Sequence, residues 1–384
     1  MTAFIYTLWN AIKAANKRRV VRARLKRGAA YDLSARREFT KPEQVKRVLL
    51  VTTAEGWGDS LYVLGLCARL AAEGVEVGLI VPHSSAERFR GGEGVSAVIE
   101  LDTADAPMQA AKFNPEMAID LDYVGLRMWP NRAAVFRAVE CYTATTSAFC
   151  RNANLFTEFV DLRPVRTVVE RGAALLAYIV GKPAEVPVLP RPIVRQSDID
   201  AAERWKNSVG LSRVPCVYVN AAAQDADRCF SFAQTKAMIE TTLGVVRDGF
   251  VILYGESFSP EELARLADVN RVKVLPRISF GAMCRIVETS VAVVTPDTSV
   301  VHVASAYNTP TFAVYAPNDR DYFREYAQRE AWPPLAEKQA VVAETAPNFS
   351  IDRYGYASDR VKPVSSYAET DLTRPLKIFL QSLN

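Results

Sequence analysis

The stretch VLLVTTAEGWGDSLYVLGLCARLAA, residues 48–72, decides the fold class. It opens with an apolar run rich in β-branched residues, Val48–Thr52, which predicts a strand buried on both faces of a sheet. A glycine-containing turn follows at Glu55–Asp59, and apolar residues then recur at helical spacing over Leu61–Ala72. Strand, tight turn and helix in that order are typical of an α/β protein with a parallel sheet.

The same rhythm occurs on both sides of a proline-rich segment at residues 182–192. Four prolines within ten residues exclude a helix interior and a central strand, so this segment is predicted to be a linker. The strands predicted before it are Val77–Val81, Ala97–Leu101, Met117–Leu121 and Val139–Thr143. Those predicted after it are Cys216–Asn220, Phe250–Tyr254, Val272–Leu275, Val291–Thr295 and Thr311–Tyr315. Two α/β halves follow from this pattern, with a cleft expected at the carboxyl ends of their sheets.

Two such halves suit a two-substrate enzyme, and they equally suit a binding protein that closes around one ligand. The predicted domain boundaries divide the chain into an N-terminal extension at 1–47, a first domain at 48–185 and a linker at 186–205. A second domain follows at 206–345, and a C-terminal segment at 346–384 ends in an amphipathic helix over Leu372–Leu383.

Composition excludes several classes of protein. The 384 residues are 49% hydrophobic and 23% charged, with 18 Gly and 21 Pro, which is ordinary for a globular chain. No apolar run is long enough for a transmembrane helix. The six cysteines are scattered without a CxxC pair, which disfavours a zinc site or a disulfide framework and favours reduced thiols in a cytosolic compartment. Two histidines exclude a His-rich metal site.

Charge is concentrated at the N-terminus. Residues 1–47 carry 13 Lys and Arg against 3 Asp and Glu, a net charge of +10, whereas the remainder is mildly acidic. The basic run follows an aromatic and apolar start that contains Phe4, Tyr6 and Trp9. That combination favours a basic amphipathic helix on an anionic membrane surface. A featureless basic arm and a nucleic-acid contact remain alternatives, and the acidic body weakens the second.

The turn after the first strand has two interpretations. A dinucleotide-binding GxGxxG pattern needs a glycine where this chain has Leu61, which disfavours NAD. Asp59, at the predicted helix start, is either an N-cap or a general base kept ionised by the helix dipole. The residues by themselves leave both open.

A second motif is TPDTSVVH, residues 295–302, directly after an apolar strand. A helix predicted from Ser299 places Asp297 and Thr298 at its N-terminus, where backbone N–H groups suit a diphosphate and Asp297 suits sugar hydroxyls. His302 lies one turn further in. The alternative is a capping Asp-Thr pair beside a buried, satisfied histidine.

Three further features are weaker. The loop from Asn220 to Arg228 has small residues, and Arg228 is a candidate phosphate ligand. Glu256 follows a predicted strand and is a candidate ribose ligand. The triplets Asp120-Leu121-Asp122 and Asp225-Ala226-Asp227 have the pattern of metal-nucleotide sites, but neither has a third acidic partner nearby in the sequence.

The stretch VAVVTPDTSVVHVASAYNTPTFAVYAP, residues 291–317, resembles the signature of glycosyltransferase family 9, the lipopolysaccharide heptosyltransferases. There a strand leads into D-[TS]-G-x-x-H, a small-residue helix, a Pro and another strand. The resemblance extends to residues 251–256 and 274–279. It also includes Gly58-Asp59-Ser60-Leu61, where the family has G-D-x-L, and so covers roughly residues 47–320.

The resemblance implies a GT-B type fold, with two Rossmann-like domains facing each other across a cleft. Residues 48–185 would bind the acceptor and 206–345 the nucleotide-sugar. The implied activity is inverting, metal-independent transfer of a heptose from ADP-heptose to a lipopolysaccharide core or related glycolipid acceptor, with no cofactor. The basic N-terminus then suits a protein that is cytoplasmic and peripheral on the inner face of the bacterial inner membrane, with no nucleic-acid partner.

Position by position, Asp59 matches the catalytic base of the family. Ile278 lies where the family packs an apolar residue against adenine, Arg228 falls near its phosphate-binding lysine, and Glu256 lies one residue before a ribose-binding position. The remaining matches to the nucleotide-sugar site are Asp297, Thr298, Ser299 and His302. Arg127 and Arg132, which follow the Met117–Leu121 strand, are expected to contact the acceptor.

Two departures keep alternatives open. Ser299 replaces the glycine of the signature, and Arg228 replaces the lysine. A catalytically inactive relative that binds nucleotide-sugar or glycan is therefore one alternative. A nucleotide-sugar epimerase or dehydrogenase is another, which the missing third glycine disfavours.

Overall fold

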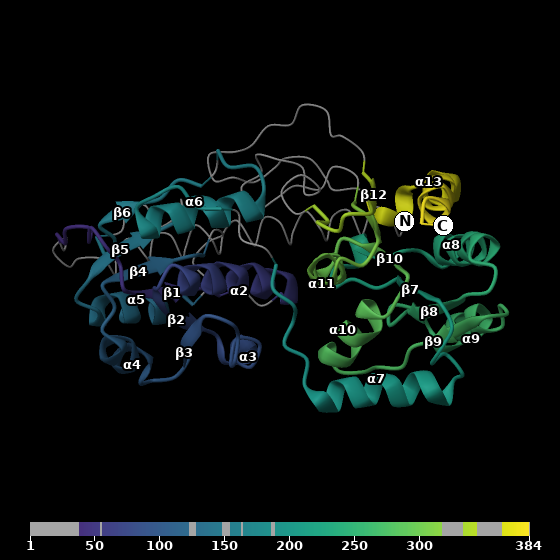
Figure 1. Cartoon of the computed structure of the whole chain (residues 1–384), viewed down its shortest axis with the longest axis horizontal. Coiled ribbons are helices and arrows are strands. Elements are labelled where there is room, and N and C mark those ends of the chain that lie inside the picture. Colours follow the sequence, from purple (N-terminus) through teal and green to yellow (C-terminus); the bar gives the residue numbers. More distant parts are fainter. Residues whose placement is uncertain are drawn as a thin grey trace, which may run out of the picture. The chain divides into compact units, whose positions relative to one another are not determined.

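The computed structural model describes residues 38–53, 56–122, 128–147, 154–162, 164–185, 189–316, 333–343 and 363–383. These residues form two compact units. The N-terminal unit consists of the described residues among 1–55, 66–164 and 173–185, and the C-terminal unit of those among 56–65, 165–172 and 186–384. Each unit contains a six-stranded parallel sheet (Figure 1).

The sheet of the N-terminal unit has the order β3-β2-β1-β4-β5-β6. Its strands are β1 (Arg47–Val51), β2 (Glu76–Val81), β3 (Val95–Glu100), β4 (Met117–Asp120), β5 (Tyr142–Thr145) and β6 (Glu158–Phe159). In β1, Val48 pairs with Val77 on one side and with Met117 on the other. The apolar residues 48–51 are all fully buried, which confirms a strand covered on both faces.

The helices of this half of the chain are α2 (Trp57–Ala72), α3 (His83–Ala86), α4 (Ala106–Phe113), α5 (Trp129–Ala138) and α6 (Val168–Val180). Helices α4 and α5 cover one face of the sheet through apolar residues such as Ala110 and Phe136. Helix α2 is followed by Gly74, whose φ of +80° is a conformation that favours glycine. The first residues of α2 and of α6 belong to the C-terminal unit by their contacts.

The sheet of the C-terminal unit has the order β12-β11-β10-β7-β8-β9. Its strands are β7 (Cys216–Asn220), β8 (Phe250–Tyr254), β9 (Val272–Val274), β10 (Ala292–Pro296), β11 (Thr311–Val314) and β12 (Gln339–Val342). Its helices are α7 (Gln196–Ser208), α8 (Phe232–Val245), α9 (Pro260–Ala267), α10 (Phe280–Glu288), α11 (Ser299–Tyr307) and α13 (Glu369–Gln381), with short 3₁₀ helices η1 (Ala226–Arg228) and η2 (Val364–Ser366).

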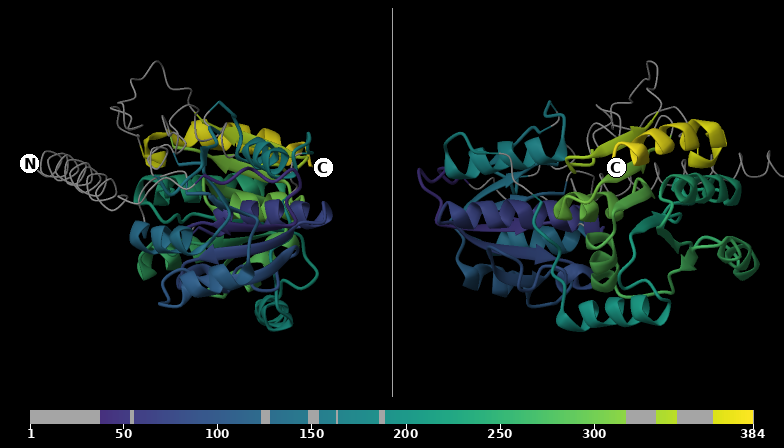
Figure 2. Two further views of the ribbon diagram at one scale, coloured as in Figure 1. Left: turned by 90° about the vertical axis from the view of Figure 1, so that its left-hand side faces the viewer. Right: turned by 45° about the vertical axis from the view of Figure 1, so that its right-hand side comes forward.

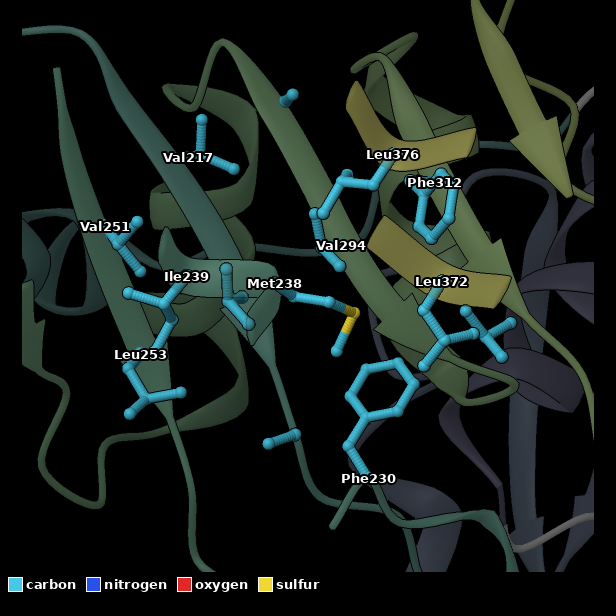
Figure 3. Close-up of a cluster of buried hydrophobic side chains, with 14 of the residues drawn as sticks. Val217, Phe230, Met238, Ile239, Val251, Leu253, Val294, Phe312, Leu372 and Leu376 are labelled. Carbon is cyan, nitrogen blue, oxygen red and sulfur yellow. The ribbon is translucent and has the colours of Figure 1, made fainter. Parts of the chain in front are cut away.

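Both faces of this second sheet are covered. One core includes Met238 of α8 together with Leu372 and Leu376 of α13 (Figure 3). The other core joins the opposite face of the sheet to α7, α10 and α11. Helix α13 packs against α8 (Figures 1 and 2). The C-terminal helix is therefore part of the core of this unit.

The strand orders locate the ligand-binding edges. Both sheets have the Rossmann order, in which successive strands step outward from the first strand in one direction and then in the other. The direction reverses between β1 and β4 in the N-terminal unit, and between β7 and β10 in the C-terminal unit. Open α/β sheets bind ligands beside the carboxyl ends of such strands.

Several predicted boundaries are wrong. Helix α2 begins at Trp57 rather than Leu61, because Gly56 and Gly58 are accommodated at its first turn, where Ser60 N–H donates to the Gly56 carbonyl. Helix α7 occupies much of the predicted linker, since the last proline of that segment is Pro192 and the helix begins only at Gln196. Helix α13 begins at Glu369 instead of Leu372.

Strand β5 begins at Tyr142 rather than Val139, because Val139 is the C-cap residue that follows α5. Strands β6 and β12 are not among the predicted strands. Within the ranges that the structure describes, no helix is both long and apolar enough to cross a membrane. The basic residues 1–37 lie outside these ranges.

Candidate active site

The N-terminus of α11 lies at the carboxyl end of β10, as predicted. Thr298 is the N-cap, and its hydroxyl accepts a hydrogen bond from the Val300 N–H at 3.3 Å. Ser299 begins the helix and is not among the described residues with positive φ. The replacement of the signature glycine by Ser299 therefore introduces no backbone strain. The first turn of the helix has the N–H groups that suit an anion.

Asn220 connects this turn to the neighbouring strand. It is the last residue of β7, is 2% exposed, and donates from Nδ2 to the hydroxyls of Thr295 (3.0 Å) and Thr298 (3.2 Å). Its own Oδ1 accepts from the N–H of Ala222, which begins the next loop. A single buried amide thus fixes both loops that flank the point where the strand order reverses.

Arg228 and Asp297, predicted separately as donor ligands, form an ion pair. Arg228 Nη1 lies 3.0 Å from Asp297 Oδ2, and the carboxylate is 4% exposed whereas the guanidinium side chain is 30% exposed. Asp225 lies 4.0 Å from Arg228 Nε. Because a guanidinium carries five N–H donors, Arg228 can pair with Asp297 and still present donors to a phosphate.

His302 is buried beneath the first turn of α2. Its Nδ1 lies 3.3 Å from the hydroxyl of Tyr62, and the two rings meet edge to face. Burial lowers the pKa of His302 to about 4, so the imidazole is neutral at physiological pH. A Cβ on Gly58 would lie 2.4 Å from His302 Cδ2. The absence of a side chain at Gly58 lets this histidine pack against the backbone that leads to Asp59.

Asp59 is not the N-cap of α2 but lies within its first turn, which corrects one of the two interpretations of this residue. Its Oδ2 occupies space 2.6 Å from where a Cβ of Gly56 would be. Burial together with the negative charges of Asp59 and Asp297 raises the pKa of Tyr62. Beside this turn, Trp57 stacks on Phe280 with 3.6 Å between ring centroids. Asp59 therefore belongs to the same group of side chains as Asp297 and His302.

Glu256 and Ile278 lie further along the same carboxyl edge. Glu256 follows β8, is exposed, accepts a hydrogen bond from the Tyr254 hydroxyl and lies 3.9 Å from Arg277 Nη1. Ile278 follows β9 and packs, partly buried, against the apolar core on the α10 side. Strand β8 is the neighbour of β7 and β9 is the next strand outward, so the predicted donor residues follow the carboxyl ends of strands in one sheet.

The prediction that Arg132 contacts the acceptor is wrong. Its side chain is fully buried, and Nη1 lies 2.6 Å from Asp120 Oδ1 and 3.2 Å from Asp122 Oδ2. Helix α5 carries Arg132 beneath the carboxyl end of β4, where both carboxylates need a cation. Arg127, the other predicted acceptor ligand, lies outside the described residues.

The same contacts show what the acidic triplet Asp120-Leu121-Asp122 does in the structure. Asp120 and Asp122 pair with Arg132, and the Thr53 hydroxyl donates to Asp122 at 2.7 Å. Burial raises the pKa of Asp122 to about 6, against the lowering effect of Arg132. In the described ranges no group of three or more His, Cys, Asp or Glu side chains is arranged to hold a metal ion.

Tyr62 and Asn220 are not among the residues predicted from the sequence as site residues. The signal that the sequence offered for these two site residues was their position next to predicted elements. Tyr62 lies three residues after Asp59, on the same side of α2, and Asn220 is a polar residue at the end of an otherwise apolar strand.

Comparison with known proteins identifies the family. The model of Glycosyltransferase family 9 (heptosyltransferase) matches residues 148–350, more than half of the chain and all of the site from Arg228 to His302. The chain belongs to glycosyltransferase family 9. The match covers most of the C-terminal unit of the glycosyltransferase, whereas Asp59 lies outside the matched residues. No curated protein matches the chain in sequence.

Solved structures share the fold of the glycosyltransferase. E. coli ADP-heptose lipopolysaccharide heptosyltransferase II is 16% identical with a TM-score of 0.62, over 88% of this chain and 99% of that one. A glycosyltransferase family 9 protein from Veillonella parvula is 13% identical with a TM-score of 0.64, over 91% and 100%. E. coli heptosyltransferase WaaC with ADP is 19% identical with a TM-score of 0.57, over 85% and 96%. The family 9 chain accordingly has the GT-B type fold of two Rossmann-like domains.

Proposed function

We propose that this glycosyltransferase moves a heptose from ADP-heptose to a lipopolysaccharide core or related glycolipid, with inversion and without a metal. One observation carries the proposal. The N-terminus of α11, the Arg228–Asp297 pair and the turn that bears Asp59 are gathered at the point where the strand order of the C-terminal unit reverses. Support for the donor comes from the solved structures named above, which include an ADP-heptose transferase and a complex with ADP.

In the proposed mechanism the leaving diphosphate binds at the N-terminus of α11. The N–H groups after Thr298 and the guanidinium of Arg228 stabilise the negative charge that develops on the leaving group. Asp297 orients Arg228 and is placed to accept hydrogen bonds from sugar hydroxyls. Glu256 and Ile278, at the next strand ends, are proposed to contact the ribose and the adenine. Fixed cationic and N–H donors take the place of a metal ion in this proposal.

Asp59 is the proposed general base. Its carboxylate takes the proton from an acceptor hydroxyl while that oxygen attacks the anomeric carbon from the face opposite the diphosphate. The bond from the anomeric carbon to the diphosphate breaks in the same step, so one displacement inverts the configuration. The N-terminal unit is proposed to bind the acceptor, and the basic N-terminal extension, residues 1–47, to bring the cytoplasmic enzyme to an anionic membrane surface.

The donor assignment is tested by thermal shift. The full chain is melted with ADP, UDP, GDP or NAD, and so are Asp297→Ala and Asp248→Ala, an exposed aspartate of the same unit as a control. Ligands that bind the folded state raise its melting temperature by mass action. Stabilisation by ADP in the wild type and in Asp248→Ala, but not in Asp297→Ala, is expected. A preference for UDP or GDP overturns the ADP donor, and a response to NAD alone overturns the transferase.

The mechanism is tested by turnover. With ADP-heptose and a lipopolysaccharide core acceptor, Asp59→Asn is expected to lower kcat by about 10²- to 10⁴-fold and to retain ADP affinity. Activity should persist in EDTA, and the product should have the inverted anomeric configuration. Near-normal turnover of Asp59→Asn would remove the base assignment, and loss of activity in EDTA would remove metal independence.

A further inference from the structure

Asn220 is a buried amide at the end of β7, and its side chain binds the two segments that carry the proposed diphosphate ligands. Its Nδ2 donates to the hydroxyls of Thr295 and Thr298, and its Oδ1 accepts from the Ala222 N–H at 3.2 Å. A backbone N–H can only donate, so Ala222 identifies the oxygen end of the amide. Both N–H groups of Nδ2 must then face the two threonines, and the amide has one orientation.

The Nδ2 end of Asn220 fixes the turn that leads from β10 into α11. Thr295 is fully buried, and its hydroxyl also donates to the Pro296 carbonyl at 2.9 Å. Its oxygen lies 3.1 Å from the hydroxyl oxygen of Thr298, which caps the helix by accepting from the Val300 N–H. The first N–H groups of α11 are therefore held at a set position relative to the end of β7.

The Oδ1 end of Asn220 fixes the loop that carries Arg228. It holds the N–H of Ala222 at the start of this loop. The loop closes on itself, because the Phe230 N–H donates to the Ala221 carbonyl at 3.1 Å. Arg228, two residues before that closure, is therefore placed by the same amide that places the N-terminus of α11.

The ion pair between Arg228 and Asp297 does not replace this connection. The guanidinium side chain is 30% exposed, and a diphosphate bound to it would compete with Asp297 for its donors. Asn220 is 2% exposed and Thr295 is fully buried, so a ligand cannot compete for their hydrogen bond. The amide thus keeps the two segments in register whether or not the donor is bound.

We propose that Asn220 is a positioning residue that sets the separation between Arg228 and the N-terminus of α11, and so favours a diphosphate over a monophosphate. The inference rests on the proposed function, which makes these two groups the ligands of the leaving diphosphate. A diphosphate that spans both groups needs them at a fixed separation, because donors placed in advance stabilise its charge without reorganisation. A monophosphate can bind at one group alone.

The test compares ADP with AMP. The full chain is titrated with each nucleotide by calorimetry, and the melting temperature of every variant is measured. Asn220→Ala removes the whole amide. Thr295→Val leaves Asn220 in place and removes one of the hydroxyls to which it donates, so it decides the question if Asn220→Ala does not fold.

Gln234 provides a matched control. It is also a 2% exposed amide of the C-terminal unit, and its Nε2 donates to two backbone carbonyls while its Oε1 accepts from a backbone N–H. These bonds connect α8 to η2 and do not involve the turn before α11. Gln234→Ala therefore removes as many buried hydrogen bonds as Asn220→Ala.

In Asn220→Ala we expect ADP affinity to fall about tenfold and AMP affinity by less than about threefold, since one oriented hydrogen bond to a charged group is lost. Thr295→Val should change the preference in the same direction by a smaller factor. Gln234→Ala should lower the melting temperature and leave the preference for ADP over AMP as in the wild type. A merely structural role of Asn220 would weaken both nucleotides equally.

Equal losses for ADP and AMP in Asn220→Ala overturn the inference, as does an unchanged preference in both Asn220→Ala and Thr295→Val. So does the same change of preference in Gln234→Ala. These results leave the proposed function intact, because the wild type still binds ADP. If the wild type prefers UDP or GDP, the ADP donor is overturned and the comparison with UMP or GMP decides this inference. A wild type that binds no nucleoside diphosphate overturns both.

Discussion

At the scale of single residues, glycine is required at position 58 because the neighbouring His302 ring leaves no room for a side chain, and not because of its backbone conformation. It lies in the first turn of α2, and a Cβ there would meet the ring of buried His302 at 2.4 Å. The ring is held by Tyr62 and by its burial, so it has little freedom to move aside. The close approach of helix and imidazole thus depends on the absence of a side chain.

Gly58→Ala is expected to lower the free energy of unfolding by about 1–3 kcal/mol and to reduce ADP affinity, because His302 must shift. Gly244→Ala is the matched control, since Gly244 lies in α8 with nothing within 4 Å of an added Cβ. That change should stabilise the protein by about 0.5–1 kcal/mol, the usual preference for alanine in a helix. Equal effects at both positions in urea unfolding would contradict the packing argument.

His302 also determines part of the dependence of stability on pH. Its pKa of about 4 in the folded chain lies below the value of about 6.5 expected when unfolded, so the unfolded state binds more protons between these values. This contribution to stability is present above pH ~6.5 and is lost as the pH falls toward 4, on the order of 3 kcal/mol in all.

His302→Gln removes the titrating group. Urea unfolding of the full chain at several pH values between 4 and 7 should therefore show a shallower loss of stability in the variant than in the wild type. Parallel curves for the two proteins would show that His302 is not neutral and buried in solution.

Arg132 is required for the N-terminal unit because its buried guanidinium pairs with the fully buried carboxylate of Asp120 and with the partly exposed carboxylate of Asp122. Arg132→Met is expected to destabilise this unit by about 3–5 kcal/mol, since Asp120 is left buried without its cation. Lys182→Met breaks the exposed pair with Glu73 and should cost less than about 1 kcal/mol. The melting temperatures of the two variants provide the measurement, and similar small shifts would argue against a buried ion pair.

At the scale of elements, α13 shows how far a local pattern predicts structure. Its apolar spacing predicts a helix, and the structure confirms one with Leu372 and Leu376 in the core (Figure 3). Its start at Glu369 was missed because the N-cap is Ala368 and the first turn is polar. The capping box of Ser259 and Glu262 at the start of α9 is, by contrast, a signal that can be read locally, because its two residues are three positions apart in the sequence.

The packing of α13 gives a test at this scale. Leu372→Ala is expected to destabilise the C-terminal unit by about 2–5 kcal/mol through loss of buried apolar contacts. Ile378 is on the same helix but 62% exposed, so Ile378→Ala should change stability by less than about 0.5 kcal/mol. A comparable loss in both variants would mean that the helix contributes by its presence and not by its buried face.

At the scale of the whole molecule, most strands of both sheets could be predicted because parallel strands buried on both faces are continuous apolar runs. Strand β6 was missed because it has only two residues, and β12 because only alternate residues are partly covered. The residues at the N-terminus of α11 were predicted from a local strand-to-helix motif. The roles of Arg132 and Tyr62 were not, because each depends on a partner far away in the sequence, Asp120 and Asp122 for one and His302 for the other.

Helix α2 is divided between the two units, and this limits how halves of the enzyme can be exchanged with those of its relatives. Residues 56–65 are encoded with the N-terminal half but pack with the C-terminal unit. A chimaera joined at the proline-rich segment would place a foreign α2 start against His302. Exchange of N-terminal halves should therefore succeed only when positions 58, 62 and 302 are inherited as a set, and these three positions should vary together in any family of recombinants selected for activity.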